Sequence, residues 1–313
     1  MMKYFMTDNQ VIHEEEKLQD GVWVRMISPT QEECEEIADV LNVDIDDIKA
    51  ALDEEESSRI ELQDGYTLIL VDIPTVEIRH EKQSYTTIPL GIILTQDVIV
   101  TVCTDDTPVL QNFVNNRVKE FSTKKKMRFV YQILFRTSAM YQSTLRIIDK
   151  KRTDIEENIG GNTEDEDLVN LHELESTLVY FATSLRANGV VLERLSRYKR
   201  LEQYPEDTEL LEDVIIENKQ AIEMTNIYSG ILSGTTEAFA SIISNNLNIV
   251  MKFLATVTIV MSIPTMIFSA YGMNLKSIGM PFADNPMGFL YVILLSLVFS
   301  ILVAIVFRKK DLF

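Results

Sequence analysis

The longest apolar run of this chain lies near its C-terminal end. Residues 287–307, MGFLYVILLSLVFSILVAIVF, form a stretch of 21 residues without a charged side chain. A helix needs about 20 apolar residues to cross the hydrocarbon core of a membrane. The alternative is a buried helix of a soluble protein, but such a helix rarely runs this long without a polar face. The pattern therefore predicts a membrane-spanning helix.

A second uncharged stretch precedes this run. Residues 253–271, FLATVTIVMSIPTMIFSAY, number 19 and carry several hydroxyl groups. Only residues 272–286 separate the two stretches. We therefore expect a membrane hairpin whose spans lie at about residues 250–271 and 287–307.

Charged residues beside the spans indicate their orientation. Arg308, Lys309 and Lys310 follow the second span directly, and such clusters mark the cytoplasmic side of a membrane. The first ten residues contain no apolar core of signal-peptide length. We expect a multi-pass protein of the cell inner or plasma membrane with both termini in the cytoplasm. The connection between the spans then lies outside.

The first span carries a polar stripe. Its members are spaced alternately three and four residues apart, which places them on one face of a helix. They are Asn248, Met251, Ala255, Thr258, Ser262, Thr265 and Ser269. Hydroxyl groups in a membrane prefer protein or water to hydrocarbon. This face is either a contact with another helix or the lining of a pore, and a pore requires several subunits because two spans cannot enclose one.

Strands and helices alternate near the N-terminus. Residues 22–27, VWVRMI, favour a strand. Residues 28–31, SPTQ, form a capping box with proline at the first helical position and predict a helix through about Leu41. Asp44 begins a second predicted helix, which runs through about Glu56.

Four further strands are predicted as two pairs. Residues 59–78 contain two of them, joined at Asp64-Gly65, which is a strong hairpin signal. Residues 88–104 contain two more, which turn at Gln96-Asp97. The pattern indicates an α/β or α+β domain.

The helical period dominates from residue 107 onward. Helices are predicted at about residues 107–121, 124–158 and 165–203. No proline occurs between Pro205 and Pro264, so we expect one long helix that runs from the soluble region into the first span.

These patterns together predict the organisation of the chain. We expect an α+β cytosolic domain followed by long helices and a two-helix C-terminal transmembrane hairpin. The predicted boundaries are residues 1–120 for the cytosolic domain, 121–246 for the helical region with the stalk helix, and 247–313 for the transmembrane region.

The charge distribution narrows the function. The formal net charge is −19, and residues 1–116 contain 25 acidic against 7 basic residues. Nucleic-acid binding requires a basic face that replaces counterions, so this class is excluded. An acidic surface suits cations or serves solubility. Two cysteines, Cys34 and Cys103, exclude a disulfide framework and a cysteine-rich metal site.

Motifs of enzymes and pumps are absent from the sequence. It contains no GxxxxGK[ST], HExxH, CxxC or GxSxG pattern. The histidines His13, His80 and His172 are dispersed in polar contexts, where surface positions are more common than ligand positions. Neither uncharged stretch, 253–271 or 287–307, contains Asp, Glu, His, Lys or Arg, although proton-coupled transporters usually keep such a group inside the membrane. We therefore expect neither an enzyme nor a resident cofactor, and a passive pathway remains.

One motif stands at the outer end of the first span, Tyr271-Gly272-Met273-Asn274. It follows a long helix and a cytosolic domain, and it precedes a second span with a basic end. This combination resembles the CorA family of divalent metal ion transporters. The resemblance implies a funnel-shaped homopentamer in the lipid bilayer, in which the first spans line the pore. Gly272, Met273 and Asn274 would then form the selectivity filter at the extracellular mouth, where amide groups meet hydrated Mg²⁺.

The resemblance also assigns the pore and a constriction. Leu254 rather than Ala255 matches the family's hydrophobic constriction, and with Met251 it would close the pore by dewetting. The implied lining consists of Asn248, Met251, Leu254, Thr258, Ser262, Thr265 and Ser269.

Family members sense cytosolic Mg²⁺ through acidic residues between subunits. The resemblance assigns Glu77 and Asp213 to this regulatory metal site, and the alternative is that both are ordinary surface acids. The outer loop departs from the family pattern, because Met280-Pro281 is followed by Phe282 instead of glutamate and the nearest acid is Asp284. This departure leaves the choice among Mg²⁺, Co²⁺, Ni²⁺ and Zn²⁺ open.

The expected function is passive uptake of Mg²⁺, inhibited by cytosolic Mg²⁺. Transport of Zn²⁺, Co²⁺ or Ni²⁺ on the same scaffold is one alternative. A membrane-anchored sensor without a pore is another, but a simple anchor has no need of the polar stripe.

Overall fold

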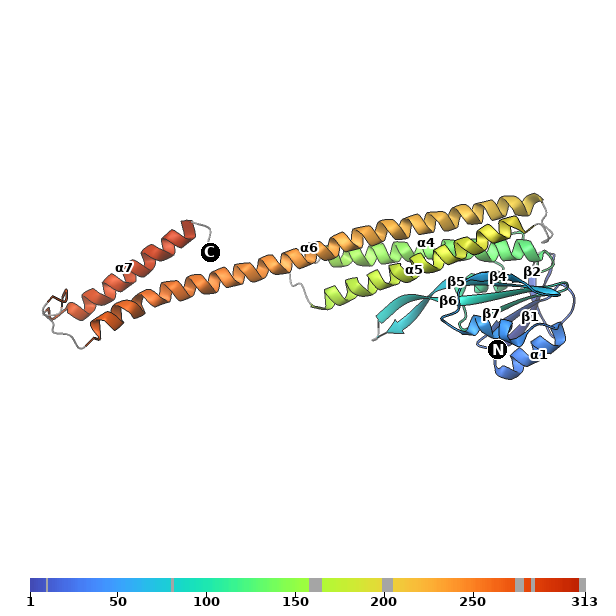
Figure 1. Ribbon diagram of the computed structural model, residues 1–313, viewed down its shortest axis with the longest axis horizontal. Coiled ribbons are helices and arrows are strands. Elements are labelled where there is room, and N and C mark those ends of the chain that lie inside the picture. Colours follow the sequence, from blue (N-terminus) through green and yellow to red (C-terminus); the bar gives the residue numbers. More distant parts are fainter. Residues whose placement is uncertain are drawn as a thin grey trace. The chain divides into compact units, whose positions relative to one another are not determined.

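The computed structural model describes residues 1–9, 11–79, 82–157, 165–198, 205–273, 279–282 and 285–309. The chain forms two compact units, Met1–Thr236 and Glu237–Phe313. The first unit holds a mixed sheet and most of the helices, and the second holds a pair of apolar helices (Figure 1).

The sheet of the first unit has the order β2-β1-β3-β7-β6-β5-β4. Its strands are β1 (Met2–Asp8), β2 (Val11–Glu15), β3 (Trp23–Ile27), β4 (Arg59–Leu62), β5 (Tyr66–Arg79), β6 (Lys82–Thr95) and β7 (Ile99–Cys103). Neighbours pair antiparallel except β3 and β7, which pair parallel with Trp23 opposite Ile99. This mixed sheet confirms the α+β class.

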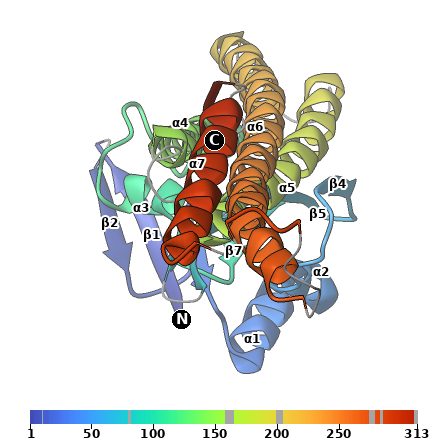
Figure 2. The ribbon, with the colours of Figure 1, turned by 90° about the vertical axis from the view of Figure 1, so that its left-hand side faces the viewer.

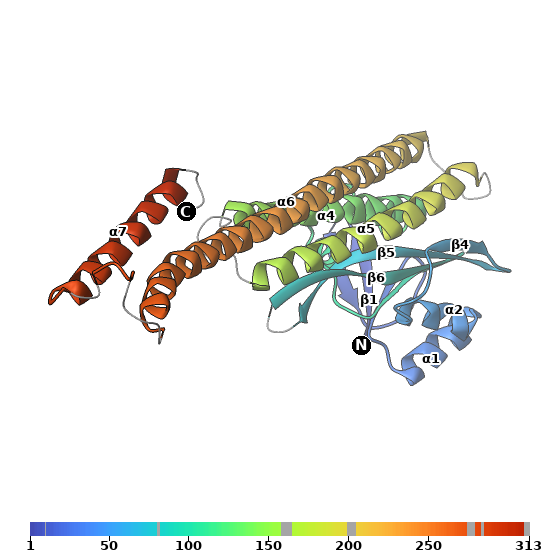
Figure 3. The ribbon, with the colours of Figure 1, turned by 60° about the vertical axis from the view of Figure 1, so that its left-hand side comes forward.

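Helices cover both faces of this sheet. The described residues of the whole chain form the helices α1 (Gln31–Leu41), α2 (Ile45–Lys49) with the short 3-10 helix η1 (Ala50–Leu52), α3 (Pro108–Val114), α4 (Lys126–Glu157), α5 (Asp165–Arg197), α6 (Pro205–Tyr271) and α7 (Gly288–Lys309), of which α7 belongs to the second unit. One apolar core joins the sheet to α1 and α2. The other joins it to α3, α4, α5 and the first part of α6, and Figure 3 shows α4 and α5 side by side over β5 and β6.

An aromatic cluster forms the centre of the larger core. Trp23 of β3 is fully buried, and its ring centroid lies 5.0 Å from that of Phe129 and 5.3 Å from that of Phe5. The Trp23 indole donates a hydrogen bond of 2.8 Å to the Thr101 hydroxyl, so its polar group is satisfied without water. The Phe5 ring of β1 is tilted by 37° against Trp23, and the Phe129 ring of α4 meets Trp23 edge to face, so these rings pack β1, β3 and α4 together.

Charged side chains protect the two edges of the sheet. β1 and β2 lie together at one edge and β4 at the other (Figure 2). The edge strand β2 carries Glu14 and Glu15, and the short strand β4 carries Arg59 and Glu61. Charges on edge strands disfavour pairing with another chain. The sequence patterns predicted neither β1 nor β2, because acidic residues lower the strand propensity of β2.

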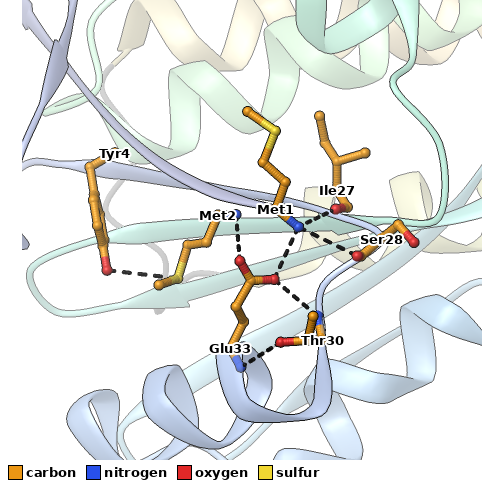
Figure 4. A network of polar contacts seen from close by, with 7 residues as sticks. All are labelled: Met1, Met2, Tyr4, Ile27, Ser28, Thr30 and Glu33. Carbon is orange, nitrogen blue, oxygen red and sulfur yellow. Dashed lines mark hydrogen bonds and ion pairs between the residues drawn. The ribbon is translucent and has the colours of Figure 1, made fainter.

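Helix α1 begins two residues later than the sequence pattern predicted. Thr30, not Ser28, is the N-cap, and the capping box closes with Glu33 instead of Gln31. The Thr30 hydroxyl accepts a hydrogen bond of 3.2 Å from the Glu33 amide, and the Glu33 carboxylate accepts one of 2.9 Å from the Thr30 amide. Figure 4 shows that the Met1 amino group also reaches Glu33, at 3.0 Å. The Thr30 amide and the Met1 amino group lower the pKa of the Glu33 carboxyl.

The other predicted elements agree in kind but differ in length. The Asp44 side chain caps α2 as predicted, but this helix ends at Lys49 instead of near Glu56. The predicted turn at Asp64-Gly65 joins β4 to β5, and Gly65 has a φ of +92°. The helix predicted from residue 107 to 121 ends at Val114.

The second unit contains two helices that are long and apolar enough to cross a membrane. One is the last part of α6 and the other is α7. They form an antiparallel hairpin (Figure 1), as the two uncharged stretches predicted. The predicted long helix without interruption is α6, which runs through Pro264 to Tyr271.

Candidate functional site

In the membrane hairpin, one face of α6 is buried or partly buried. Thr256 is only 4% exposed, and Val260, Ile263 and Ile267 are partly buried. These residues follow steps of four, three and four, which is one face of a helix. On α7 the buried residues Val292, Ser296 and Ser300 follow steps of four. We infer that small residues let the two helices of the hairpin approach along these faces.

The polar stripe lies on the other side of α6. At about 100° per residue, Thr258, Ser262, Thr265 and Ser269 lie roughly 180–240° around the helix from Thr256. Thr258, Thr265 and Ser269 are exposed, and Ser262 is partly buried. The contact with α7 therefore does not use the stripe. Within the described residues of this unit, α7 is therefore excluded as the helix that packs on the polar stripe.

The hydroxyl groups of the stripe donate to the backbone of their own helix. Thr258 donates to the Leu254 carbonyl at 2.8 Å, and Ser262 donates to the Ile259 carbonyl at 2.8 Å. Thr265 donates to the Met261 carbonyl at 3.2 Å. A hydroxyl that donates its proton in this way keeps its oxygen lone pairs free to accept. The stripe therefore presents acceptor oxygens, which suit a hydrated cation.

Apolar side chains occupy the same side of α6 below these hydroxyl groups. Met251 is 60% exposed and Leu254 is 54% exposed, and Asn248 is exposed as well. Exposed apolar residues on a helix that spans a membrane contact lipid or neighbouring protein, or narrow a pore.

The outer end of α6 carries the motif. Helix α6 ends at Tyr271, and the Gly272 amide still donates to the Phe268 carbonyl at 2.9 Å. Gly272 and Met273 are both exposed. Asn274, the third residue of the predicted filter, lies outside the described residues.

A short connection returns the chain to α7. The Tyr271 hydroxyl donates a hydrogen bond of 3.0 Å to the Pro281 carbonyl. The Asn285 side-chain oxygen accepts a hydrogen bond of 3.0 Å from the amide of Met287, the residue directly before α7. A cavity of about 530 Å³ lies between the end of α6 and the start of α7. Four aromatic residues line it: Phe268, Tyr271, Phe282 and Phe289.

The predicted regulatory acids lie in the first unit. Glu77 is on β5 and partly buried, and Asp213 is on α6 and exposed. Among the residues that the structure describes, no three His, Cys, Asp or Glu side chains are placed to hold a metal ion. His13 and His172 are exposed, as predicted, and His80 lies outside the described residues.

Strand β5 is tied to the helices five residues before Glu77. The Asn188 side chain of α5 accepts from the Asp72 amide at 2.9 Å and donates to the Asp72 carbonyl at 2.8 Å. The Tyr141 hydroxyl of α4 donates to the same carbonyl at 3.1 Å. Burial raises the pKa of the Asp72 carboxyl, and hydrogen bonds from Ser184 and Ser58 oppose this shift. The backbone of β5 at Asp72 is therefore hydrogen-bonded to both α4 and α5.

Sequence patterns did not reveal the contacts that hold the outer connection. The residues concerned are Tyr271, Pro281, Phe282 and Gly288. Tyr271 was singled out in the motif and Met280-Pro281 with Phe282 in the outer loop, but no pattern predicted a contact between them. A hydrogen bond from a side chain to a backbone carbonyl ten residues later leaves no periodic signal.

Comparison with known proteins gives one family. The sequence profile described as CorA-like Mg2+ transporter protein matches residues 19–309. A cobalt/magnesium transport protein CorA from Methanocaldococcus jannaschii is 28% identical over 92% of this chain and 90% of its own length. A magnesium transport protein CorA from Helicobacter pylori is 24% identical over 92% of this chain and 90% of its own length.

Solved structures show the same fold. The complete structure of the CorA magnesium transporter from M. jannaschii covers 99% of this chain and 98% of its own, with a TM-score of 0.82 and 25% identity. The full-length CmaX protein covers 99% of this chain and 97% of its own, with a TM-score of 0.70 and 15% identity. This second likeness concerns the fold alone.

Proposed function

Because the chain belongs to the family of CorA-like Mg2+ transporter proteins, we propose that it forms a passive channel for divalent cations, with Mg²⁺ as the principal ion. The channel is a pentamer in the cell inner or plasma membrane with both termini in the cytoplasm. The first membrane helix of each subunit, the end of α6, lines the pore. The polar stripe on the side of α6 away from α7 is the observation that supports this proposal.

The ion enters as a hydrated ion. Mg²⁺ releases its water reluctantly, so a neutral filter that accepts hydrogen bonds from that water selects it without stripping it. Gly272, Met273 and Asn274 form this filter. The acceptor oxygens of Thr258, Ser262, Thr265 and Ser269 then hydrogen-bond the hydrated ion along the pore. Residues 253–271 and 287–307 carry no acidic side chain that would trap a divalent cation.

The gate is apolar. Met251 and Leu254 occupy the same side of α6 as the hydroxyl groups, and Asn248 follows at the cytoplasmic end. When rings of such side chains approach one another, water leaves the constriction and conduction stops. A rotation or outward movement of α6 rewets the pore.

Cytosolic Mg²⁺ closes the channel. The site lies between subunits, so one subunit contributes Glu77 and its neighbour contributes Asp213. Facing carboxylates repel unless a cation lies between them, and Mg²⁺ bridges them through its own water. The bound metal stabilises the closed state, and by linkage the closed state binds metal more tightly. The link from β5 to α4 and α5 at Asp72 carries this change toward the helices.

Ion flux into liposomes tests the proposed function. Mg²⁺, Co²⁺, Ni²⁺ and Zn²⁺ are supplied in turn to liposomes that contain the purified protein, each with a dye that responds to that ion. We expect Mg²⁺ to enter. Co²⁺ is the second candidate ion, because the relative from M. jannaschii is described as a cobalt/magnesium transport protein. Liposomes that admit none of these ions would refute the proposal and favour the sensor without a pore.

Removing one regulatory carboxylate is expected to weaken the effect of cytosolic Mg²⁺. In Asp213→Ala and in Glu77→Ala, the Mg²⁺ concentration that protects half of the protein from proteolysis is expected to rise roughly tenfold, because a charged ligand is lost. Inhibition of flux by internal Mg²⁺ is expected to shift in parallel. Glu212→Ala is the matched control, since it removes an exposed charge one residue away. If both variants keep wild-type protection and inhibition, these acids serve solubility only.

A further inference from the structure

Contacts of Tyr271, Phe282 and Gly288, which are not filter residues, attach the connection between the two membrane helices to the ends of these helices. The Tyr271 hydroxyl donates to the Pro281 carbonyl at 3.0 Å, which joins the last residue of α6 to the returning chain. Tyr271 immediately precedes Gly272, where the helix ends. This hydrogen bond attaches the last residue of α6 to the segment that precedes α7.

Phe282 and Gly288 form a second attachment. Phe282 has a φ of +64°, a left-handed conformation that is strained for an aromatic residue. Its carbonyl lies so close to Gly288 that a Cβ atom added there would lie 2.2 Å from the oxygen. The Asn285 amide donates to the Phe282 carbonyl at 3.2 Å, and the Gly288 amide donates to the Asn285 carbonyl at 2.8 Å. Only glycine permits this approach at the start of α7.

The Phe282 side chain adds an aromatic contact. Its ring centroid lies 5.4 Å from that of Tyr291 on α7, with the rings tilted by 41°. Aromatic pairs at such distances are attractive. The Phe282 ring thus packs on the first turn of α7, and its carbonyl is hydrogen-bonded to Asn285 and lies close to Gly288. Strain at one residue is retained where surrounding contacts fix its conformation.

We propose that Tyr271, Phe282 and Gly288 are positioning residues of the ion entrance, which hold the filter at a constant distance from the pore axis. This inference rests on the proposed function. A filter that recognises the water shell of an ion depends on the position of its acceptors, and the mouth has little charge with which to compensate for a displaced ring. Phe282 thus supplies rigidity at the position where the family pattern has an acid that supplies charge.

Tyr271→Phe tests the hydrogen bond and keeps the ring. We expect the external Mg²⁺ concentration for half-maximal flux to rise roughly threefold to tenfold, the equivalent of one neutral hydrogen bond. Maximal flux at saturating Mg²⁺ is expected to change less, because the pore below the entrance is intact. Tyr291→Phe is the matched control, since it removes the same atom from the ring that packs on Phe282 and leaves that ring in place.

Gly288→Ala tests the close approach. We expect a larger rise in half-maximal Mg²⁺ than in Tyr271→Phe, because the methyl group displaces the Phe282 backbone. The matched control is Gly230→Ala on α6, where an added Cβ meets no atom within 4 Å. The oligomer of each variant is verified by size-exclusion chromatography, and Tyr271→Phe retains the test if Gly288→Ala does not assemble.

Labelling of a cysteine introduced at position 273 reports the position of the filter and does not require a measurement of ion flux. Met273→Cys introduces an exposed thiol beside Gly272, whereas Cys34 and Cys103 are buried and burial raises the pKa of both thiols, that of Cys103 to about 11. We expect Tyr271→Phe and Gly288→Ala to change the rate at which Met273→Cys reacts with a membrane-impermeant thiol reagent by at least roughly threefold.

The labelling rate of Met273→Cys and the Mg²⁺ concentration for half-maximal flux together distinguish this inference from the proposed function. Wild-type labelling rates in both variants would overturn the positioning role, whatever the flux. Wild-type half-maximal Mg²⁺ in both variants would overturn it as well, while the channel itself would stand. Altered labelling in a protein that admits no divalent cation would support the attachment and refute the channel.

Discussion

Asn274→Ala is expected to abolish Mg²⁺ flux while the oligomer stays folded. A methyl group accepts no hydrogen bond from the water shell of an ion. Each lost hydrogen bond costs about 1 kcal/mol net, and every subunit of the pentamer loses one. We therefore expect flux to fall by at least roughly a hundredfold, since about 1.4 kcal/mol corresponds to a factor of ten.

The measurement is Mg²⁺ influx into liposomes, with thermal unfolding and size-exclusion chromatography as tests of integrity. Substitutions at surface positions usually change the free energy of unfolding by less than about 0.5 kcal/mol, and we expect Asn274→Ala to be one of them. Asn246→Ala is the matched control, because it makes the same change at an exposed position of α6 that lies off the stripe. Flux at the wild-type rate from folded Asn274→Ala would show that this amide is not the filter.

The membrane potential alone is expected to accumulate Mg²⁺ inside liposomes. A unit charge gains about 2.3 kcal/mol for each 100 mV, so a divalent ion gains about 4.6 kcal/mol. That free energy corresponds to an equilibrium concentration ratio of roughly two-thousandfold. No phosphate-binding loop is present in the sequence, and residues 253–271 and 287–307 contain no Asp, Glu, His, Lys or Arg.

The experiment imposes an inside-negative potassium diffusion potential and follows internal Mg²⁺. Abolishing the potential is expected to reduce accumulation to simple equilibration, and added nucleotide or a pH gradient is expected to change nothing. Accumulation that begins only after nucleotide is supplied, or only with a pH gradient, would identify an active transporter.

The spacing of polar residues in the first span predicted which of them share one face of α6. It did not predict whether that face contacts another helix or lines a pore. The steps from Thr258 to Ser269 place four hydroxyl residues together on α6, and a helix contact and a pore lining explain that pattern equally well. The burial of Thr256 shows that the contact with α7 uses the opposite side. Only a folded hairpin separates these cases, because burial depends on a neighbour that is distant in the sequence.

The sequence patterns did not predict the correct start of α1 or the strands β1 and β2, because residues distant in the sequence determine these features. The capping box was predicted at residues 28–31, yet the structure uses Thr30 and Glu33. The Met1 amino group and the Met2 amide also donate hydrogen bonds to the Glu33 carboxylate. Strands β1 and β2 were missed because they exist through pairing with β3 and with each other.

The sequence by itself determined the two membrane spans, the long helix α6 and the membership in the family. These features depend on local composition, since about 20 uncharged apolar residues are stable only across a membrane or in a core. The tertiary structure decided the order of the strands, the side of α6 that meets α7, and the attachment of the outer connection through Tyr271, Phe282 and Gly288. Those features depend on contacts between residues far apart in the chain, whose geometry no periodic pattern encodes.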